Sequence, residues 1–164
     1  MRDSFLVTLP DAYLVEIGKI TVQWSALENV FDLCGIKLLG MDGGEPRAWA
    51  VFAHVTFAQR LDMFGAILDS LQSGYPKLQD YKTILTLVKE AQTARNKVIH
   101  ARWLYENGVV KIMRLTARGK VKTSSEPITT DDLKGTAELI GRASVQVWKL
   151  VVAGGADDGN TSKE

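Results

Sequence analysis

The spacing of hydrophobic residues predicts four long helices along this chain. Apolar side chains recur at three- and four-residue steps over about 9–39, 57–71, 77–101 and 130–152, which is the period of a helix with one buried face. A shorter helix is expected over 47–54. The last helix should end at Gly154-Gly155, which leaves residues 154–164 as a flexible tail.

Between the third and fourth long helices, apolar and polar residues alternate instead. Three short runs are separated by glycine-containing sequences of the kind that turn antiparallel strands. The runs are Trp103–Tyr105, Val109–Leu115 and Lys120–Lys122, and the turns are Glu106-Asn107-Gly108 and Ala117-Arg118-Gly119. The expected fold is mainly α, a helical bundle of four long helices plus a short one. A small antiparallel β-hairpin or meander, over about 103–127, is inserted before the last helix in a single domain of residues 1–153.

Composition narrows the class of protein. The 164 residues are 46% hydrophobic, enough for one ordinary core, and no window approaches the roughly 20 apolar residues of a membrane span. No targeting segment is recognised at the start, so a cytoplasmic protein without a membrane partner is expected. Cys34 is the only cysteine, so no internal disulfide forms, and its apolar neighbours indicate a buried, inert thiol. Only two histidines are present, and we predict no metal site and no cofactor.

Positive charge is concentrated in the middle of the chain. Residues 89–122 carry 9 Lys or Arg against 2 Asp or Glu, whereas residues 1–88 carry 7 against 10 and residues 123–164 carry 4 against 7. This block could bind an anion such as phosphate. The alternative is a solvated charged face.

The third long helix places an arginine where an apolar residue is expected. Tyr81, Val88 and Ile99 fall within about 80° of Arg95 on a helical projection, and a buried guanidinium needs a partner or a solvated cavity. Glu28 is a candidate partner because it interrupts the apolar stripe of the first helix. The two side chains would form a structural salt bridge, or Glu28 would orient Arg95 while other N–H groups of the guanidinium bind a phosphate.

Two further polar side chains lie beside Arg95. Asn96 and His100 are four residues apart, so the helix projects Arg95, Asn96 and His100 into one arc. An imidazole can move a proton near neutral pH, and a guanidinium can stabilise a phosphorane. In principle, this pair suffices for a ribose 2′-hydroxyl to attack its own phosphodiester.

The segment Arg95-Asn96-Lys97-Val98-Ile99-His100 resembles the Arg, polar residue, three residues, His signature of the HEPN superfamily of small helical ribonucleases and nucleotide-binding proteins. The first-helix pattern Trp24-Ser25-Ala26-Leu27-Glu28 is also similar, and the resemblance covers about Leu9–Trp103 and Thr129–Val152. It implies a homodimer with a composite cleft, and metal-independent RNA cleavage that leaves a cyclic phosphate. The catalytic roles would fall on Arg95, His100 and Asn96, with Glu28 as an orienting acid.

The strand-rich insertion departs from the family pattern and carries much of the basic block. We expect nucleic acid to be bound by Arg102, Lys111, Arg114, Arg118, Lys120 and Lys122. The leading hypothesis is a metal-independent endoribonuclease that serves as the toxin of a toxin–antitoxin pair, with an antitoxin protein as partner, or in defence. The alternatives are a non-catalytic homodimer that acts as a scaffold, and a module that binds RNA or a nucleotide without cleaving it.

Overall fold

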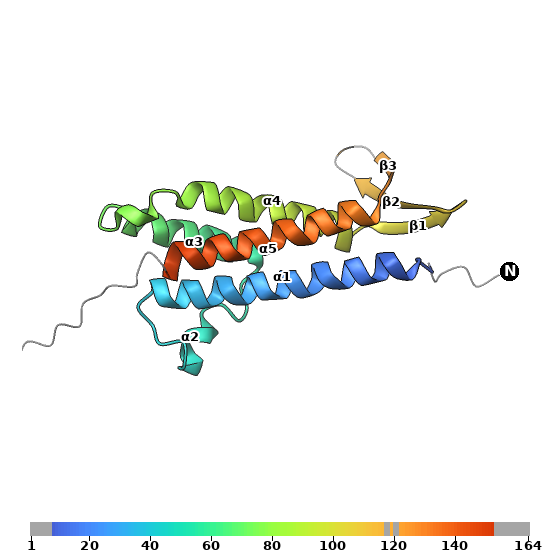
Figure 1. Ribbon diagram of the computed structural model, residues 1–164. Helices are drawn as coiled ribbons and strands as arrows, with labels where there is room; N and C mark the ends of the chain where they lie inside the picture. The colour runs from blue at the N-terminus through green and yellow to red at the C-terminus, as the bar shows by residue number, and fades with distance from the viewer. Residues whose placement is uncertain (1–7, 117–118, 120–121, 153–164) are drawn as a thin grey trace, which may run out of the picture. The chain divides into compact units, whose positions relative to one another are not determined.

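The computed structural model describes residues 8–116, 119 and 122–152, and it confirms the predicted fold class. Within these residues the chain is mainly helical, with five α-helices, four of them long, and a small three-stranded antiparallel sheet before the last helix (Figure 1). The elements are α1 (Asp11–Leu38), α2 (Pro46–Ala50), α3 (Phe57–Leu71), the 3₁₀ helix η1 (Pro76–Leu78), α4 (Tyr81–Ile99), β1 (Arg102–Glu106), β2 (Val109–Thr116), β3 (Lys122–Pro127) and α5 (Thr130–Val152). None of the described helices is long and apolar enough to span a membrane.

Two helices begin with capping boxes that the sequence encodes locally. The Thr56 hydroxyl accepts a hydrogen bond from the Gln59 amide, and the Gln59 side chain accepts one from the Thr56 amide. Before α5, the Asp132 carboxylate accepts the Thr129 amide at 2.8 Å and the Thr129 hydroxyl accepts the Asp132 amide at 3.2 Å. Each box satisfies amides that the first turn of a helix leaves unpaired.

Several predicted boundaries are shifted, among them the short helix, which is Pro46–Ala50 and not 47–54. The third long helix begins at Tyr81 instead of Lys77, because Pro76–Leu78 forms a separate 3₁₀ turn and the Asp80 carbonyl accepts the first helical hydrogen bonds, from Thr83 and Ile84. The third strand is Lys122–Pro127 and not Lys120–Lys122, since β2 continues to Thr116 and pairs there with Lys122. Predictions at 117–118, 120–121 and 153–164 lie outside the described residues.

The chain contains two compact units. One comprises Met1–Trp24 and Glu90–Gly141, and the other Ser25–Lys89 and Arg142–Glu164. Helices α1, α4 and α5 each run through both units. The prediction of a single domain over residues 1–153 stays a prediction.

The second unit has an apolar core to which four helices contribute. Phe31 of α1 packs against Phe57 and Phe64 of α3, with ring centroids 5.3 and 4.3 Å apart. Helix α5 joins it through Val147, whose carbonyl lies 3.9 Å from the Cys34 sulfur, and α4 supplies the buried Val88.

An ion pair fixes the loop between α2 and α3 onto α1 in the same unit. Arg60 Nη1 lies 3.0 Å from both carboxylate oxygens of Asp32, and its other nitrogens donate to the carbonyls of Phe52 and Val55. Burial raises the pKa of Asp32, the Arg60 guanidinium opposes this, and the negative charge of Glu28 adds to it. The two side chains are only 15% and 13% exposed, so loss of either partner would leave a largely desolvated charge.

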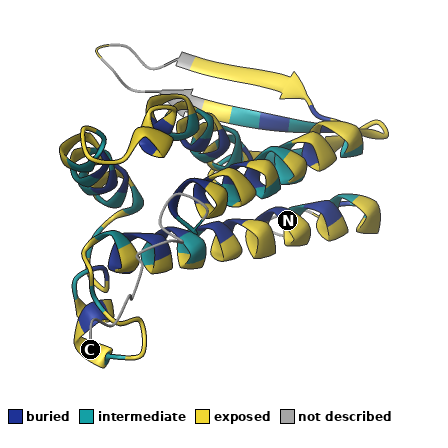
Figure 2. Cartoon of the chain, turned by 60° about the vertical axis from the view of Figure 1, so that its left-hand side comes forward, coloured by how far each residue is buried: buried dark blue, intermediate teal, exposed yellow. Residues whose placement is uncertain are grey.

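The first unit contains the sheet, with strand order β1-β2-β3. Asn107 (φ 52°) and Gly108 (φ 78°) form the two-residue turn between β1 and β2, and positive φ at both positions is the signature of a type I′ hairpin. One sheet face is buried through Val110 and Ile112. The edge strand β3 is exposed over residues 123–127 (Figure 2).

The buried side of α1 in the first unit differs from the predicted stripe. Leu14 is 51% exposed, whereas Glu16 is 6% exposed and lies in line with Ile20 and Trp24 at four-residue steps. Lys19 Nζ donates to Glu16 Oε1 at 2.9 Å. The carboxylate therefore occupies a position that hydrophobicity alone assigns to a hydrocarbon.

Candidate functional site

The end of α4 brings three predicted site residues together. Arg95 Nη1 lies 3.0 Å from Asn96 Oδ1 and 3.2 Å from His100 Nε2. The His100 amide donates to the Asn96 carbonyl at 3.2 Å, which extends the helical path by one residue beyond Ile99. Arg95 is half-buried, while Asn96 and His100 are exposed. The convergence predicted from helical spacing is confirmed for these three residues.

The contact between Arg95 and His100 favours one tautomer of the neutral imidazole. A guanidinium has five N–H donors and no acceptor, and it stays protonated. At 3.2 Å, the hydrogen bond therefore needs His100 Nε2 as the acceptor, with the proton of the neutral ring on Nδ1. An unprotonated imidazole nitrogen can take a proton from a hydroxyl group as a general base, provided that the hydroxyl replaces Arg95 as the donor to its single lone pair.

The ring of Trp24, on α1, lies next to the guanidinium. The Arg95 guanidinium carbon lies 5.4 Å from the centroid of the Trp24 ring, within the distance of a cation–π contact. Trp24 is only 5% exposed, so the ring is a fixed surface. Arg95 Nε is buried and has no hydrogen-bond partner among the described residues, which makes the contact with the ring more important for its placement.

Sequence reasoning proposed Glu28 as the partner of Arg95 and missed Trp24. Glu28 is half-buried and belongs to the second unit, whereas Arg95 and Trp24 belong to the first. Within its own unit, the charge of Glu28 acts on Asp32. The role of Glu28 as an orienting acid stays a prediction.

The guanidinium keeps donors that could bind a ligand. Both described polar contacts of Arg95 use Nη1, and the described residues of the first unit supply no hydrogen bond to Nη2. The Nη2 amino group can donate charge-assisted hydrogen bonds to oxygens of a phosphate or a carboxylate. The cluster can therefore hold an anion next to an imidazole that accepts protons.

The basic residues of the insertion differ in how their charges are placed. Lys111 lies 3.6 Å from the Glu106 carboxylate, and Arg114 lies 4.0 Å from Glu126, which also binds Lys97 at 3.1 Å. Arg102 is exposed and has no carboxylate within ion-pair distance among the described residues. Arg118 and Lys120 lie outside the described residues, and the side chain of Lys122 is not described.

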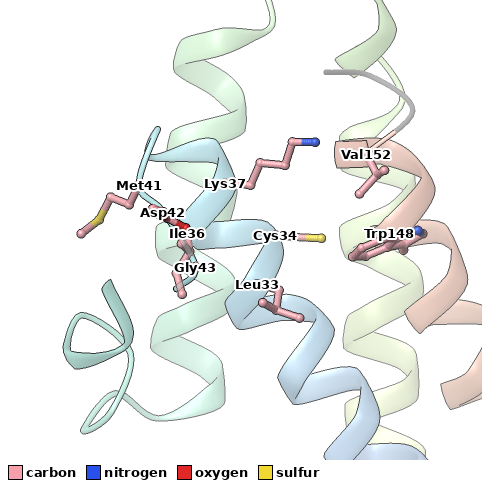
Figure 3. Close-up of a pocket in the computed structure, with 9 residues that line it drawn as sticks. All are labelled: Leu33, Cys34, Ile36, Lys37, Met41, Asp42, Gly43, Trp148 and Val152. Carbon is pink, nitrogen blue, oxygen red and sulfur yellow. The ribbon is translucent and has the colours of Figure 1, made fainter. Parts of the chain in front are cut away.

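The second unit has a shallow pocket of about 360 Å³, shown in Figure 3. Its lining is formed by Leu33, Cys34, Ile36, Lys37, Met41, Asp42, Gly43, Trp148 and Val152. Burial raises the pKa of the Cys34 thiol to about 12, although the charge of Lys37 opposes the shift. The predicted burial of Cys34 is confirmed, and a raised pKa agrees with the expected low reactivity, because the thiolate is then scarce at neutral pH.

The described residues place no group of three or more His, Cys, Asp or Glu side chains where they could share a metal ion. Comparisons with family models, curated proteins and solved structures find no match. A function for this chain therefore has to be argued from the site itself.

Proposed function

We propose that this protein is a metal-independent endoribonuclease of the HEPN type that uses Arg95 and His100. The observation that carries the proposal is the 3.2 Å contact between Arg95 Nη1 and His100 Nε2. It joins a permanent cation to a proton acceptor at the exposed end of a helix, and it agrees with the resemblance of the Arg95–His100 segment to the family signature.

The proposed reaction uses the RNA strand as its own nucleophile. When the RNA phosphate binds, Arg95 exchanges His100 Nε2 for the phosphate, and the freed Nε2 accepts the proton of a ribose 2′-hydroxyl as the 2′-oxygen attacks the adjacent phosphorus. The bond from phosphorus to the 5′-oxygen breaks, that oxygen takes up a proton from water, and the protonated imidazole returns its proton to the solvent. The products are a 2′,3′-cyclic phosphate and a 5′-hydroxyl. General base catalysis of this kind contributes about 10²- to 10⁴-fold in rate.

Arg95 would stabilise the charge that develops on the phosphoryl oxygens. Its Nη2 donors are directed by two constraints, the Trp24 ring at 5.4 Å and the Nη1 contacts with Asn96 and His100. A donor placed before the reaction begins costs little reorganisation as the transition state forms. Asn96 would act by holding Arg95 and not by proton transfer.

Cleavage of RNA by the purified full chain in the presence of a chelator tests the proposal. We expect wild-type activity to survive EDTA and to fall at least 10²-fold in Arg95→Ala and in His100→Ala. His54→Ala is the matched control, since His54 is exposed in a turn of the second unit. Absence of cleavage over a broad set of RNAs, or cleavage that persists in both site variants, would contradict the proposal.

One observation favours a second candidate, a non-catalytic homodimer of HEPN type. Arg95 Nη1 finds both of its partners, Asn96 and His100, on its own helix, so the cluster is in part internally satisfied. In such a protein, Arg95→Ala would lower the melting temperature or dissociate the dimer, and wild-type protein would never cleave RNA. Light scattering and thermal unfolding of the same variants distinguish the two candidates. The ribonuclease proposal carries three further predictions that are untested: a role as a toxin or in defence, an antitoxin partner, and a cytoplasmic location.

A further inference from the structure

The register of the sheet sorts the basic residues of the insertion onto two faces. Arg102 pairs with Met113, the residue before Arg114, along the β1–β2 ladder. Since residues directly opposite each other in a sheet share a face and successive residues alternate, Arg102 and Arg114 lie on opposite faces. Lys111 pairs with Leu104, two residues from Arg102 and two from Met113, so it shares the face of Arg102.

The two faces differ in their surroundings. The face with Arg114 packs onto the rest of the unit through Val110 and Ile112, which are 2% and 1% exposed, while Arg114 itself is exposed and lies next to Glu126. The Arg102 face is the outer one: Arg102, Ser125 and Pro127 on it are exposed, and Leu104, Lys111 and Met113 are half-buried. This outer face carries two cations, Arg102 and Lys111, one carboxylate, Glu106, and the apolar side chains of Leu104 and Met113.

The ion pairs of the sheet also distinguish Arg102 from the other basic residues. Arg114 and Lys97 both lie next to Glu126, and Lys111 lies next to Glu106. Arg102 is the basic residue of the sheet whose described surroundings offer no carboxylate within ion-pair distance. An exposed guanidinium without a carboxylate partner can bind an external anion directly. A paired guanidinium must first give up its carboxylate, which costs additional free energy.

Arg102 is also close to the candidate site along the chain. It follows His100 by two residues, and two residues of extended chain span at most about 7 Å between Cα atoms. Successive charges on one strand of a B-form duplex advance by about 3.4 Å along the helix axis. A strand whose phosphate lies beside His100 could therefore place another phosphate, a nucleotide or two further along, next to Arg102.

We propose that the outer face of the sheet, with Arg102 as its main phosphate-binding residue, holds the RNA strand next to the Arg95–His100 site. This inference rests on the proposed function for the identity of the ligand. It makes Arg102 a positioning residue, and it removes Arg114 from the set of residues expected to bind nucleic acid. Lys111 would contribute less than Arg102, because Glu106 competes with the strand for its charge.

Binding of a fluorescent single-stranded RNA with 2′-O-methyl riboses tests this inference without cleavage. Fluorescence anisotropy over a salt series gives the affinity and the number of phosphate contacts. We expect Arg102→Ala to weaken binding about fivefold in 0.1 M salt and to lower the magnitude of the log–log salt slope by about 0.7, the contribution of one phosphate contact on a single strand. Arg102→Lys should keep the slope and lose less affinity.

Two further variants make the result specific. Arg114→Ala tests the opposite face, and Arg142→Ala removes one exposed positive charge from α5 in the second unit. Both should bind like wild type. If wild type fails to bind, or if Arg102→Ala and Arg114→Ala lose the same affinity, the inference is overturned.

A second arm keeps the inference separate from the proposed function. The same variants are assayed with unmodified RNA for cleavage, where Arg102→Ala should raise KM and leave kcat within about twofold. If wild type binds through Arg102 without cleaving any RNA, the ribonuclease proposal fails and the binding face stands. If wild type cleaves RNA but Arg102→Ala has the KM of Arg114→Ala, the ribonuclease proposal stands and the binding face fails.

Discussion

Nη1 of Arg95 lies 3.2 Å from Nε2 of His100, and a guanidinium can only donate in this contact. The arrangement predicts one tautomer of His100, with the proton on Nδ1. Long-range ¹H–¹⁵N NMR spectra at pH 8 should show an unprotonated Nε2, and Arg95→Ala should shift the ring toward the mixture of tautomers expected for an exposed histidine such as His54, which lies in a turn. A proton on Nε2 in wild type would contradict the contact.

The stacking of Arg95 on Trp24, at 5.4 Å, predicts that an aromatic ring is needed behind the guanidinium. A cation–π contact contributes about 0.5–2 kcal/mol and is weaker with Phe than with Trp. Trp24→Phe should lower cleavage several-fold, and Trp24→Leu should lower it further.

The Hε resonance of Arg95 provides a readout for Trp24 that does not depend on activity. The ring current of Trp24 should displace this resonance in wild type, less in Trp24→Phe, and not at all in Trp24→Leu. Trp148→Phe is the control, since Trp148 is 46% exposed and lies in the second unit. An Arg95 Hε chemical shift that is the same in wild type, Trp24→Phe and Trp24→Leu would show that the Trp24 ring does not contact the guanidinium.

The ion pair of Asp32 and Arg60 predicts a pH-dependent loss of stability. Arg60→Ala should lower the free energy of unfolding by about 3 kcal/mol at pH 7, because it leaves a largely buried carboxylate without its cation. Arg47→Ala, which breaks the exposed pair with Glu45, should cost less than about 1 kcal/mol.

The sign of the pH effect follows from the shifted pKa of Asp32. Burial already raises this pKa, and Arg60 opposes the shift, so removal of Arg60 raises it further. A raised folded-state pKa of an acid gives stability that is present below about pH 4, the unfolded value, and is lost as pH rises through the folded value. Urea unfolding should therefore show a smaller penalty for Arg60→Ala at pH 4 than at pH 7. An equal penalty at both pH values would exclude a desolvated Asp32.

Substitution by alanine at two glycines of α1 should have opposite effects on stability. A Cβ built on Gly35 would lie 2.6 Å from Cζ of the buried Phe52, whereas one on Gly18 has no such neighbour within 4 Å. Gly35→Ala should destabilise the protein by about 1–3 kcal/mol through overpacking. Gly18→Ala should stabilise it by up to about 1 kcal/mol, through helix propensity. Thermal unfolding checks both, and a neutral Gly35→Ala would show that Phe52 packs elsewhere.

Much of the fold could be predicted because its signals are local. The helical period identifies α1, α3, α4 and α5, the Thr56 and Gln59 pair marks the start of α3, and Asn107-Gly108 supplies the backbone conformation of a type I′ turn. The third strand was misplaced because Lys122–Pro127 is an exposed edge. Such a strand has no alternation of buried and exposed positions to give its register.

The candidate site could be predicted only as far as one helix determines it. Spacing along α4 is sufficient to bring Arg95, Asn96 and His100 together, since helical geometry fixes their directions. The stacking of Trp24 on Arg95 depends on how side chains of different helices meet, and sequence spacing carries no such information. The burial of Glu16 and the pairing of Asp32 with Arg60 were missed for the same reason.

The chemical ends of the RNA fragments produced by wild-type protein distinguish attack by the 2′-hydroxyl from attack by water. Cleavage in EDTA should yield 2′,3′-cyclic phosphate and 5′-hydroxyl ends, detected by mass spectrometry. A single 2′-deoxyribose at the cleaved position should abolish cleavage there, and both Arg95→Ala and His100→Ala should yield no product. Ends with a 5′-phosphate, or cleavage that continues at a 2′-deoxyribose, would contradict attack by the 2′-hydroxyl and with it the role assigned to Arg95 and His100.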